Sequence, residues 1–303
     1  MKRFYQSICG NLPAIAIGLS GISFGTIGFF GSRLFDAGFT AYQMLFWRFL
    51  FASLLLLPLL KGYSIRHISL KGLLSCLGLG GIFYSLSSFC FFQAIPYIGS
   101  GIAMVIFYAF PLIVAFLNWI IDHQKLTPRE LLAIVLMIPG VLLLALSNDV
   151  QFDPFGIVLG MGSALFYGIY FYASKRGGEH LPPVWASLMV CVGNMLFFAL
   201  ICWQGNGFNT PQSNGSWGYC VGIALLGTTL PLWLLFVGLK KVPVTKAALI
   251  SVLEPISTVM IGVIVLDETL SFLQFFGMII ILAAAILVQL KAASKKPVEL
   301  TSV

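Results

Sequence analysis

A single carboxylate, Glu254, lies in the middle of a long apolar stretch of this 303-residue chain, directly before Pro255. An ionised carboxylate inside a membrane is costly unless it faces water or a partner. Pro255 removes a backbone donor at the same depth and so frees polar groups where a binding site needs them. Such an acid can exchange a proton or counter the cationic part of a solute. In the alternative, structural interpretation, Glu254 bonds the backbone groups that Pro255 leaves unpaired.

Four other charged residues bear on the chemistry. Arg48 is the only basic residue well inside a predicted span; it either binds a carboxylate of the solute or, as we favour, tethers a carbonyl or a helix end. Lys246 lies near the start of its span, from where a lysine can extend to the membrane surface. Asp267 and Glu268 end the same span, where we expect them to N-cap the next helix; part of an outer gate is the alternative.

Polar and aromatic side chains at mid-depth form a further group. Tyrosine and tryptophan can stack on a planar solute and hydrogen-bond it, although ordinary packing explains any one of them equally well. The candidate solute-binding residues are Glu254, Arg48, Ser23, Phe24, Tyr84, Ser88, Tyr108, Tyr167, Tyr170 and Trp233, with Ser87 beside them. We therefore expect a cavity with an aromatic wall and one acid.

The composition indicates a polytopic membrane protein. Hydrophobic residues make up 59% of the chain, charged residues 9%, and the mean hydropathy is +0.99. Soluble domains carry about a quarter charged residues, and a soluble chain this apolar would expose too much hydrophobic surface. The six cysteines have neither CxxC nor metal-ligand spacing, so we expect buried thiols, no metal and no cofactor. The net charge of +7 is not gathered in a basic domain, which argues against nucleic acid as a partner.

Ten apolar segments, each bounded by charges, proline or glycine clusters, are long enough to cross a membrane as helices. None shows the short alternating pattern of a transmembrane barrel strand. The first is read as a retained span rather than a signal peptide. The segments are Leu12–Gly31, Thr40–Leu60, Lys71–Gln93, Ile98–Ile121, Pro128–Ser147, Phe155–Ser174, Pro182–Trp203, Trp217–Leu239, Val244–Leu266 and Ser271–Leu290.

The basic residues predict the orientation of these spans. With the N-terminus in the cytoplasm, all of the 17 lysines and arginines except Arg33 and Arg48 fall at cytoplasmic ends. The opposite orientation would invert this asymmetry, so we expect both termini in the cytoplasm. The basic side chains would then face the anionic lipid headgroups, which accounts for the net charge.

The chain also repeats itself. Pro111 and Pro255 lie 144 residues apart in apolar runs that stay in register, and Gly18 falls on Gly162 with the same offset. The offset maps the first five spans onto the last five. Because five is odd, the second copy must cross the membrane in the opposite direction. Inverted repeats of this kind are a transporter architecture with the solute bound near the midplane.

Three stretches resemble the drug/metabolite transporter superfamily, in particular its proteins with two EamA repeats. They are WRFLFASLLLLP (Trp47–Pro58), IPYIGSGIAMVIFYAFPLIVAFL (Ile95–Leu117) and the segment Lys240–Leu282, which holds Leu-Glu-Pro, a Glu before Thr-Leu, and Gln274 three residues before Gly277. The first repeat departs from the family by ending in Asp122-His123-Gln124 where a Glu is usual. The resemblance covers essentially the whole chain and implies transport of small organic solutes across the inner (cytoplasmic) membrane.

We therefore expect an all-α polytopic membrane protein whose ten transmembrane helices form two inverted-topology five-helix repeats. Residues 1–150 form the first repeat, 151–291 the second and 292–303 a cytoplasmic tail. The expected function is secondary transport of an amino-acid-like or amine-bearing aromatic solute by alternating access, coupled to protons or to exchange. The chain has no Walker A motif for ATP. An intramembrane enzyme, for which no Ser–His pair or paired aspartates speak, and a channel or structural protein remain alternatives. The expected partners are the solute and lipid, with a homodimer as one open possibility.

Overall fold

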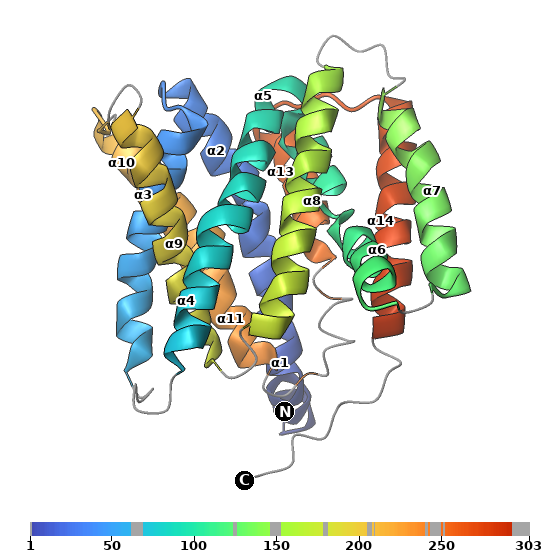
Figure 1. Ribbon diagram of the computed structural model, residues 1–303, viewed down its shortest axis with the longest axis horizontal. Helices are drawn as coiled ribbons and strands as arrows, with labels where there is room; N and C mark the ends of the chain where they lie inside the picture. Colours follow the sequence, from blue (N-terminus) through green and yellow to red (C-terminus); the bar gives the residue numbers. More distant parts are fainter. Residues whose placement is uncertain are drawn as a thin grey trace.

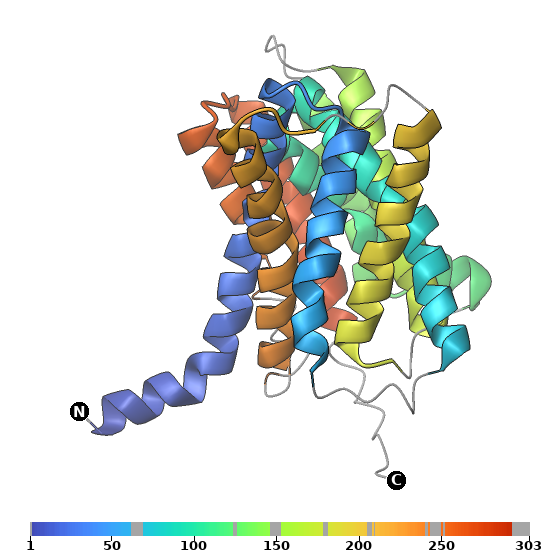
Figure 2. The ribbon, with the colours of Figure 1, turned by 90° about the vertical axis from the view of Figure 1, so that its left-hand side faces the viewer.

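The computed structural model describes residues 2–61, 69–123, 126–145, 153–177, 181–204, 208, 210–239, 242, 250 and 252–292. Within these ranges every regular element is a helix, and the helices lie roughly side by side in a bundle (Figure 1). The start of α1 and the end of α14 lie at the same end of the bundle (Figures 1 and 2). We call this the terminal end and the other the distal end.

The elements follow one another along the chain with short connections. The first half contains α1 (Lys2–Gly25), α2 (Ile27–Asp36), α3 (Ala41–Leu56), η1 (Leu57–Leu60), α4 (Leu70–Leu79), η3 (Gly80–Tyr84), α5 (Ser85–Phe107), α6 (Phe110–Ile121) and α7 (Pro128–Ala145). The second half contains α8 (Pro154–Gly177), α9 (Pro183–Gln204), α10 (Asn214–Ala224), η4 (Leu225–Thr229), α11 (Leu230–Leu239), α13 (Leu253–Val265) and α14 (Phe272–Ala292).

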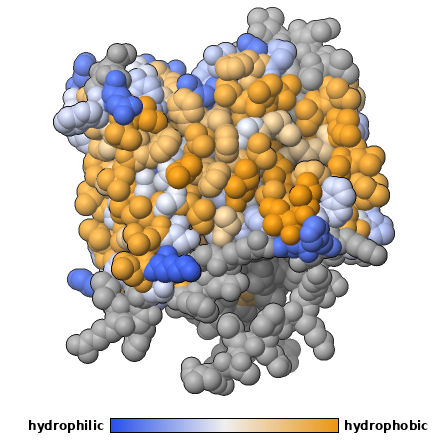
Figure 3. Space-filling model, in the orientation of Figure 1, coloured by the Kyte–Doolittle hydropathy of each residue, from blue (hydrophilic) through white to orange (hydrophobic). Residues whose placement is uncertain are grey.

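The outer surface of the bundle is apolar. In the part of the chain that the structure describes, six helices are long and apolar enough to cross a membrane, and four shorter apolar helices accompany them. Many large hydrophobic side chains point outward, and they form a broad band with polar residues toward both ends of the molecule (Figure 3). A band of this kind is stable only in contact with lipid. The chain is a multi-pass membrane protein.

Glycine and proline mark the places where helices of the bundle bend or begin. α5 bends at Gly99, whose φ of 76° is a left-handed conformation that glycine adopts without strain. After the bend the chain turns at residues 108 and 109 and enters α6, which has Pro111 in its first turn. Pro255 likewise lies in the first turn of α13, so each proline helps to begin a helix instead of interrupting one.

Side-chain caps fix the start of α7 and, as a capping box, the start of α14. The Thr127 backbone N–H and hydroxyl donate to the Glu130 carboxylate at 2.7 and 2.8 Å. At α14 the Ser271 N–H donates to Gln274 Oε1 at 2.9 Å, and the Gln274 N–H donates to Ser271 Oγ at 3.2 Å. The prediction that Asp267 and Glu268 cap this helix is therefore wrong: a reciprocal Ser–Gln pair nearer the helix already satisfies the cap.

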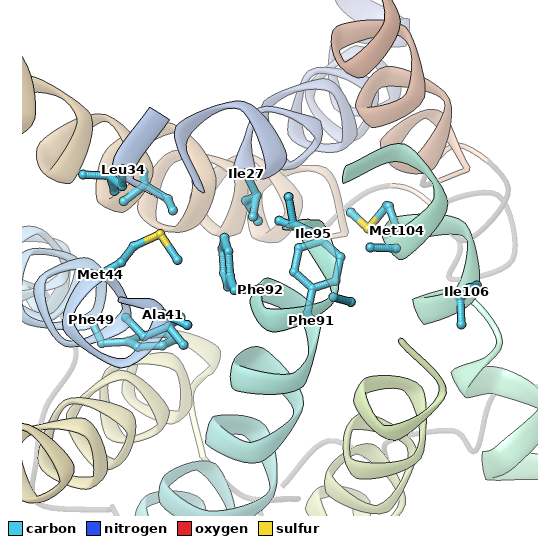
Figure 4. Packing of buried hydrophobic residues seen from close by; sticks show 14 of the residues in the cluster. Ile27, Leu34, Ala41, Met44, Phe49, Phe91, Phe92, Ile95, Met104 and Ile106 are labelled. Carbon is cyan, nitrogen blue, oxygen red and sulfur yellow. The ribbon is translucent and has the colours of Figure 1, made fainter. Parts of the chain in front are cut away.

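The largest hydrophobic cluster includes a layer on the distal side of the bundle. Figure 4 shows how Ile27, Phe91, Phe92 and Met104 group together between α2 and the two limbs of α5. Phe92 is fully buried, and Gly31 lets its ring approach the backbone of α2 closely. This layer lets no open space continue toward the distal end, and it forms the floor of the cavity described next.

Candidate functional site

A cavity of about 470 Å³ lies between the two halves of the chain. Toward the distal end its lining stops at Ile27 and Phe92, in the hydrophobic layer of Figure 4. Toward the terminal end it continues to Pro183, an exposed residue at the very start of α9. Among the described residues, the lining thus ends in this hydrophobic layer on the distal side and at an exposed residue at the terminal end.

Glu254 stands in the wall of this cavity, in the first turn of α13. The hydroxyl of Tyr108, from the turn between α5 and α6, donates to Glu254 Oε2 at 2.7 Å. The first turn of a helix carries partial positive charge, which favours a carboxylate there. The break before Pro255 therefore delivers the acid to the cavity, and a phenol from the other half orients it.

Arg48 is the other charged residue among the described residues that line the cavity. It is 3% exposed, and its guanidinium lies 5.1 and 5.7 Å from the rings of Phe49 and Phe92. Its Nε donates to Thr228 Oγ1 at 3.0 Å and its Nη2 to the Gly227 carbonyl at 3.4 Å. The Gly227 carbonyl is thus a partner of the kind that the interpretation of Arg48 as a structural tether requires.

Aromatic rings make up one wall of the cavity. The ring centroids of Tyr167 and Tyr170 of α8 lie 5.8 Å apart. They lie 5.8 and 5.3 Å, respectively, from the ring centroid of Tyr84. The ring centroids of Phe107 and Phe110 lie 4.8 and 4.7 Å from the ring centroid of Tyr167. The faces of such rings attract organic cations, and their hydroxyl groups provide hydrogen-bond partners.

The structure brings eight of the ten predicted residues to the cavity lining. They are Glu254, Arg48, Phe24, Tyr84, Ser88, Tyr108, Tyr167 and Tyr170, and Ser87 joins them. Trp233 and Ser23 are not in the lining. Trp233 is 46% exposed, since its neighbour Leu232 faces the cavity and the next residue is rotated by about 100°. The Ser23 hydroxyl donates to the Leu226 carbonyl at 2.6 Å and so ties α1 to η4.

Two lining residues that the sequence interpretation missed were within reach of the repeat. Phe110 stands 144 residues before Glu254, and Thr228 stands 144 residues after Tyr84. Applying the repeat offset to the predicted residues would have identified both. Ser187 and Cys191 of α9 also line the cavity, and no motif in the sequence marks them.

Glu268 makes the strongest polar contact between the halves at the distal end. Its carboxylate accepts hydrogen bonds from the Ser100 N–H and hydroxyl, both at 2.7 Å, and from the Gly101 N–H at 3.2 Å. These donors begin the second limb of α5, directly after the bend at Gly99. We call this contact the distal clasp. It joins the end of α13 to α5 behind the closed floor of the cavity.

The comparison with protein families matches residues 11–146 and 154–290, each as one copy of the EamA-like transporter family. The chain belongs to this family. An uncharacterized transporter of Archaeoglobus fulgidus is 26% identical over 92% of this chain and 97% of its own length. The threonine/homoserine exporter RhtA of Escherichia coli K12 is 27% identical, with 67% of this chain and 68% of that protein covered. The resemblance predicted from the sequence is confirmed.

A solved crystal structure supports the fold independently of close sequence similarity. It superposes with a TM-score of 0.63 and covers 92% of this chain and 96% of its own, at 16% sequence identity. At this identity the likeness concerns the fold alone. The relatives named above carry the functional argument.

Proposed function

We propose that this protein is a secondary transporter that moves a small organic amine or amino acid across the cytoplasmic membrane by alternating access. One observation carries the proposal: a cavity between the two halves, open at one end and closed at the other, with an acid and an aromatic wall at its centre. Transporters built from paired repeats bind their solute in this place.

Ten spans are the count that the helices support best. The six long apolar segments and four shorter ones of the described chain supply one span each. The bend at Gly99 separates the third span from the fourth. The part of α5 after the bend continues through the turn at residues 108 and 109 into α6, so this part belongs to the fourth span. Spans three and four therefore each contain part of α5. The sequence prediction places the boundary between these two spans between Gln93 and Ile98.

The internal structure of the two halves supports an inverted repeat. The two non-glycine residues with positive φ that the structure describes, His123 and Asp267, lie 144 residues apart. The capping pair Thr127 and Glu130 has the same offset to Ser271 and Gln274. Helix contacts are also paired: α1 packs on α11 as α8 packs on α4 and α5, and α1 packs on α13 as α8 packs on α6. These contacts correspond when the halves are exchanged.

The basic residues supply the orientation. Among the described residues, Lys61, Lys71, Arg129, Lys175, Arg176 and Lys291 belong to helix ends at the terminal end, which we infer to be cytoplasmic. The cavity then opens to the cytoplasm, and the distal clasp closes its external side. In the alternate state of the cycle the clasp would break and the cytoplasmic mouth would close. In this inward-open state the solute reaches Glu254 from the cell interior.

The cavity lining supports an amine-bearing solute. Glu254 provides a negative charge, and the adjoining tyrosine and phenylalanine rings provide faces for a cation. The volume suits a molecule of the size of an amino acid or a small aromatic amine. RhtA is named for threonine and homoserine, both of which carry an ammonium group. Glu254 is also the carboxyl group that would exchange a proton for the solute.

Counterflow in proteoliposomes tests the proposal. Radiolabelled phenylalanine, phenylethylamine and threonine serve as probes, since the first two differ only in the carboxylate. We expect preloaded solute to accelerate uptake of at least one probe, and Glu254→Gln to lower that rate about tenfold or more. Trp233→Phe is the control, because Trp233 lies outside the cavity. Uptake without acceleration by preloaded solute would instead indicate a channel, and wild-type rates in Glu254→Gln would exclude the role of the acid.

A further inference from the structure

The walls of the cavity contain two π-turns, η3 and η4, at corresponding places in the two halves. They occupy residues 80–84 and 225–229, so they are separated by almost the repeat offset. A π-turn holds one extra residue and leaves a backbone carbonyl short of its ordinary helical partner. Each turn also contributes a lining residue, Tyr84 from η3 and Thr228 from η4. The geometry of the two turns therefore decides where part of the polar wall stands.

The Gly80 carbonyl of η3, which accepts from the Ser85 N–H within the turn, is also bonded by Asn194 of α9. Asn194 is fully buried, and its Nδ2 donates to the Gly80 carbonyl at 3.0 Å and to the Val190 carbonyl at 2.8 Å. The Ser85 hydroxyl donates to Asn194 Oδ1 at 2.9 Å. Asn194 belongs to the second half of the chain and η3 to the first.

The Gly227 carbonyl of η4 is bonded by Arg48 of α3, with the halves exchanged; its ordinary helical donor would be residue 231, a proline without an N–H. Arg48 donates to the Gly227 carbonyl and to the Thr228 hydroxyl. Two nitrogens of the guanidinium thus donate to groups of η4. Tyr84 of η3 and Arg48 both line the cavity.

We propose that Arg48 and Asn194 are positioning residues that fix the two π-turns from the opposite half, and that neither binds the solute. Arg48 then acts on transport through Gly227 and Thr228 of η4. Asn194 acts through Tyr84 although it does not line the cavity. This inference rests on the transport function proposed above and assigns recognition of the solute to its ammonium group. A carboxylate on the solute has no partner in Arg48.

The competing role for Arg48 is a ligand for a solute carboxylate. Phenylalanine and phenylethylamine separate the two roles, because only phenylalanine carries the carboxylate. We expect Arg48→Lys, which keeps the charge but loses the planar fork, to raise the KM of both probes by the same factor, about tenfold. A loss confined to phenylalanine would assign Arg48 to the carboxylate and overturn the proposal.

A double-mutant cycle tests the link to the π-turn. Thr228→Val keeps the shape of the side chain and removes the hydroxyl that Arg48 bonds. If Arg48 works through Thr228, the double variant Arg48→Lys with Thr228→Val transports no worse than Arg48→Lys alone. Additive losses would show two independent roles. Asn194→Leu should raise the KM of both probes as well, whereas Ser53→Ala, which removes a buried hydroxyl bonded only within α3, should leave it unchanged.

Melting temperatures in detergent keep this inference separable from the transport function. The cycle is repeated with the melting temperature as the readout, which needs no solute. Non-additive losses of melting temperature for Arg48→Lys and Thr228→Val support the coupling even if the wild-type protein transports neither probe. Absence of transport would count against the proposed function alone. Additive losses of melting temperature would overturn the coupling whatever the transport result.

Discussion

The distal clasp gives the sharpest test of alternating access, because three hydrogen bonds converge on one carboxylate. Glu268 accepts from Ser100 N and Oγ at 2.7 Å and from Gly101 N at 3.2 Å. Glu268→Gln keeps the size of the side chain but removes its charge and one acceptor oxygen. Bonds to a charged group are worth about 1.5–3 kcal/mol and neutral ones about 1 kcal/mol.

The expected shift follows from these bonds. Glutamine retains the carbonyl oxygen and so keeps part of the contact, and Glu268 is only half-buried, so we take a net loss of about 2 kcal/mol. The clasp exists only while the external side is closed, so its loss favours the outward-open state by about 30-fold. Gly262→Ala should act in the same direction, because its new methyl group would collide with the Glu268 carboxylate.

Thiol accessibility measures this shift. Ser88 lines the cavity and is replaced by cysteine in a variant whose six native cysteines are alanine. We expect Glu268→Gln to increase labelling of this cysteine by a membrane-impermeant reagent added outside, and to decrease labelling from the cytoplasmic side. Asp267→Asn is the matched control, since Asp267 is exposed and adjacent. Unchanged external labelling in both Glu268→Gln and Gly262→Ala would refute the assignment of the clasp as a gate.

Two further predictions concern the cavity acid and the helix packing. Tyr108→Phe should raise the KM for phenylethylamine about fivefold, because Glu254 loses the hydroxyl that orients it. Tyr97 is an exposed tyrosine outside the cavity, so Tyr97→Phe should leave this KM unchanged. Equal effects of the two substitutions would contradict the role of the Tyr108 hydroxyl. Gly193→Ala should lower the melting temperature by about 5 °C or more, because its methyl group would collide with the backbone of α4. Gly218→Ala meets nothing within 4 Å and should leave the melting temperature unchanged, and an equal fall in both variants would argue against the close helix contact.

The sequence predicted the class of protein and most of the cavity for a physical reason. An apolar run of membrane length has few alternatives, and an acid or arginine inside such a run must face a polar interior. Glu254, Arg48 and the tyrosines therefore pointed to the cavity without any knowledge of the packing. Trp233 misled because an amphipathic ring is equally at home against lipid, and the phase of its helix decided the outcome.

The features that escaped prediction depend on contacts distant in sequence. The π-turns add one residue to a helix inside a uniformly apolar run, so the hydrophobic pattern does not register them. The partners of Glu268 lie 167 and 168 residues away, and a local cap was the simpler expectation. Ser271 and Gln274 already supply the cap of α14. A Ser-x-x-Gln pattern close to an acid therefore weakens the interpretation of the acid as the cap.

Comparison of the two halves separates scaffold from site. Positions that set the backbone agree between the repeats: both prolines begin helices, and both side-chain caps close with the same spacing. Positions that face the cavity differ, with Phe110 where the other half has Glu254, and Tyr84 where it has Thr228. A symmetric pair of acids would repel across so small a cavity, and a symmetric pair of phenylalanines would leave an ammonium group without a counter-charge. The asymmetry at equivalent positions is therefore what allows a symmetric scaffold to bind a solute with one charged end and one apolar end.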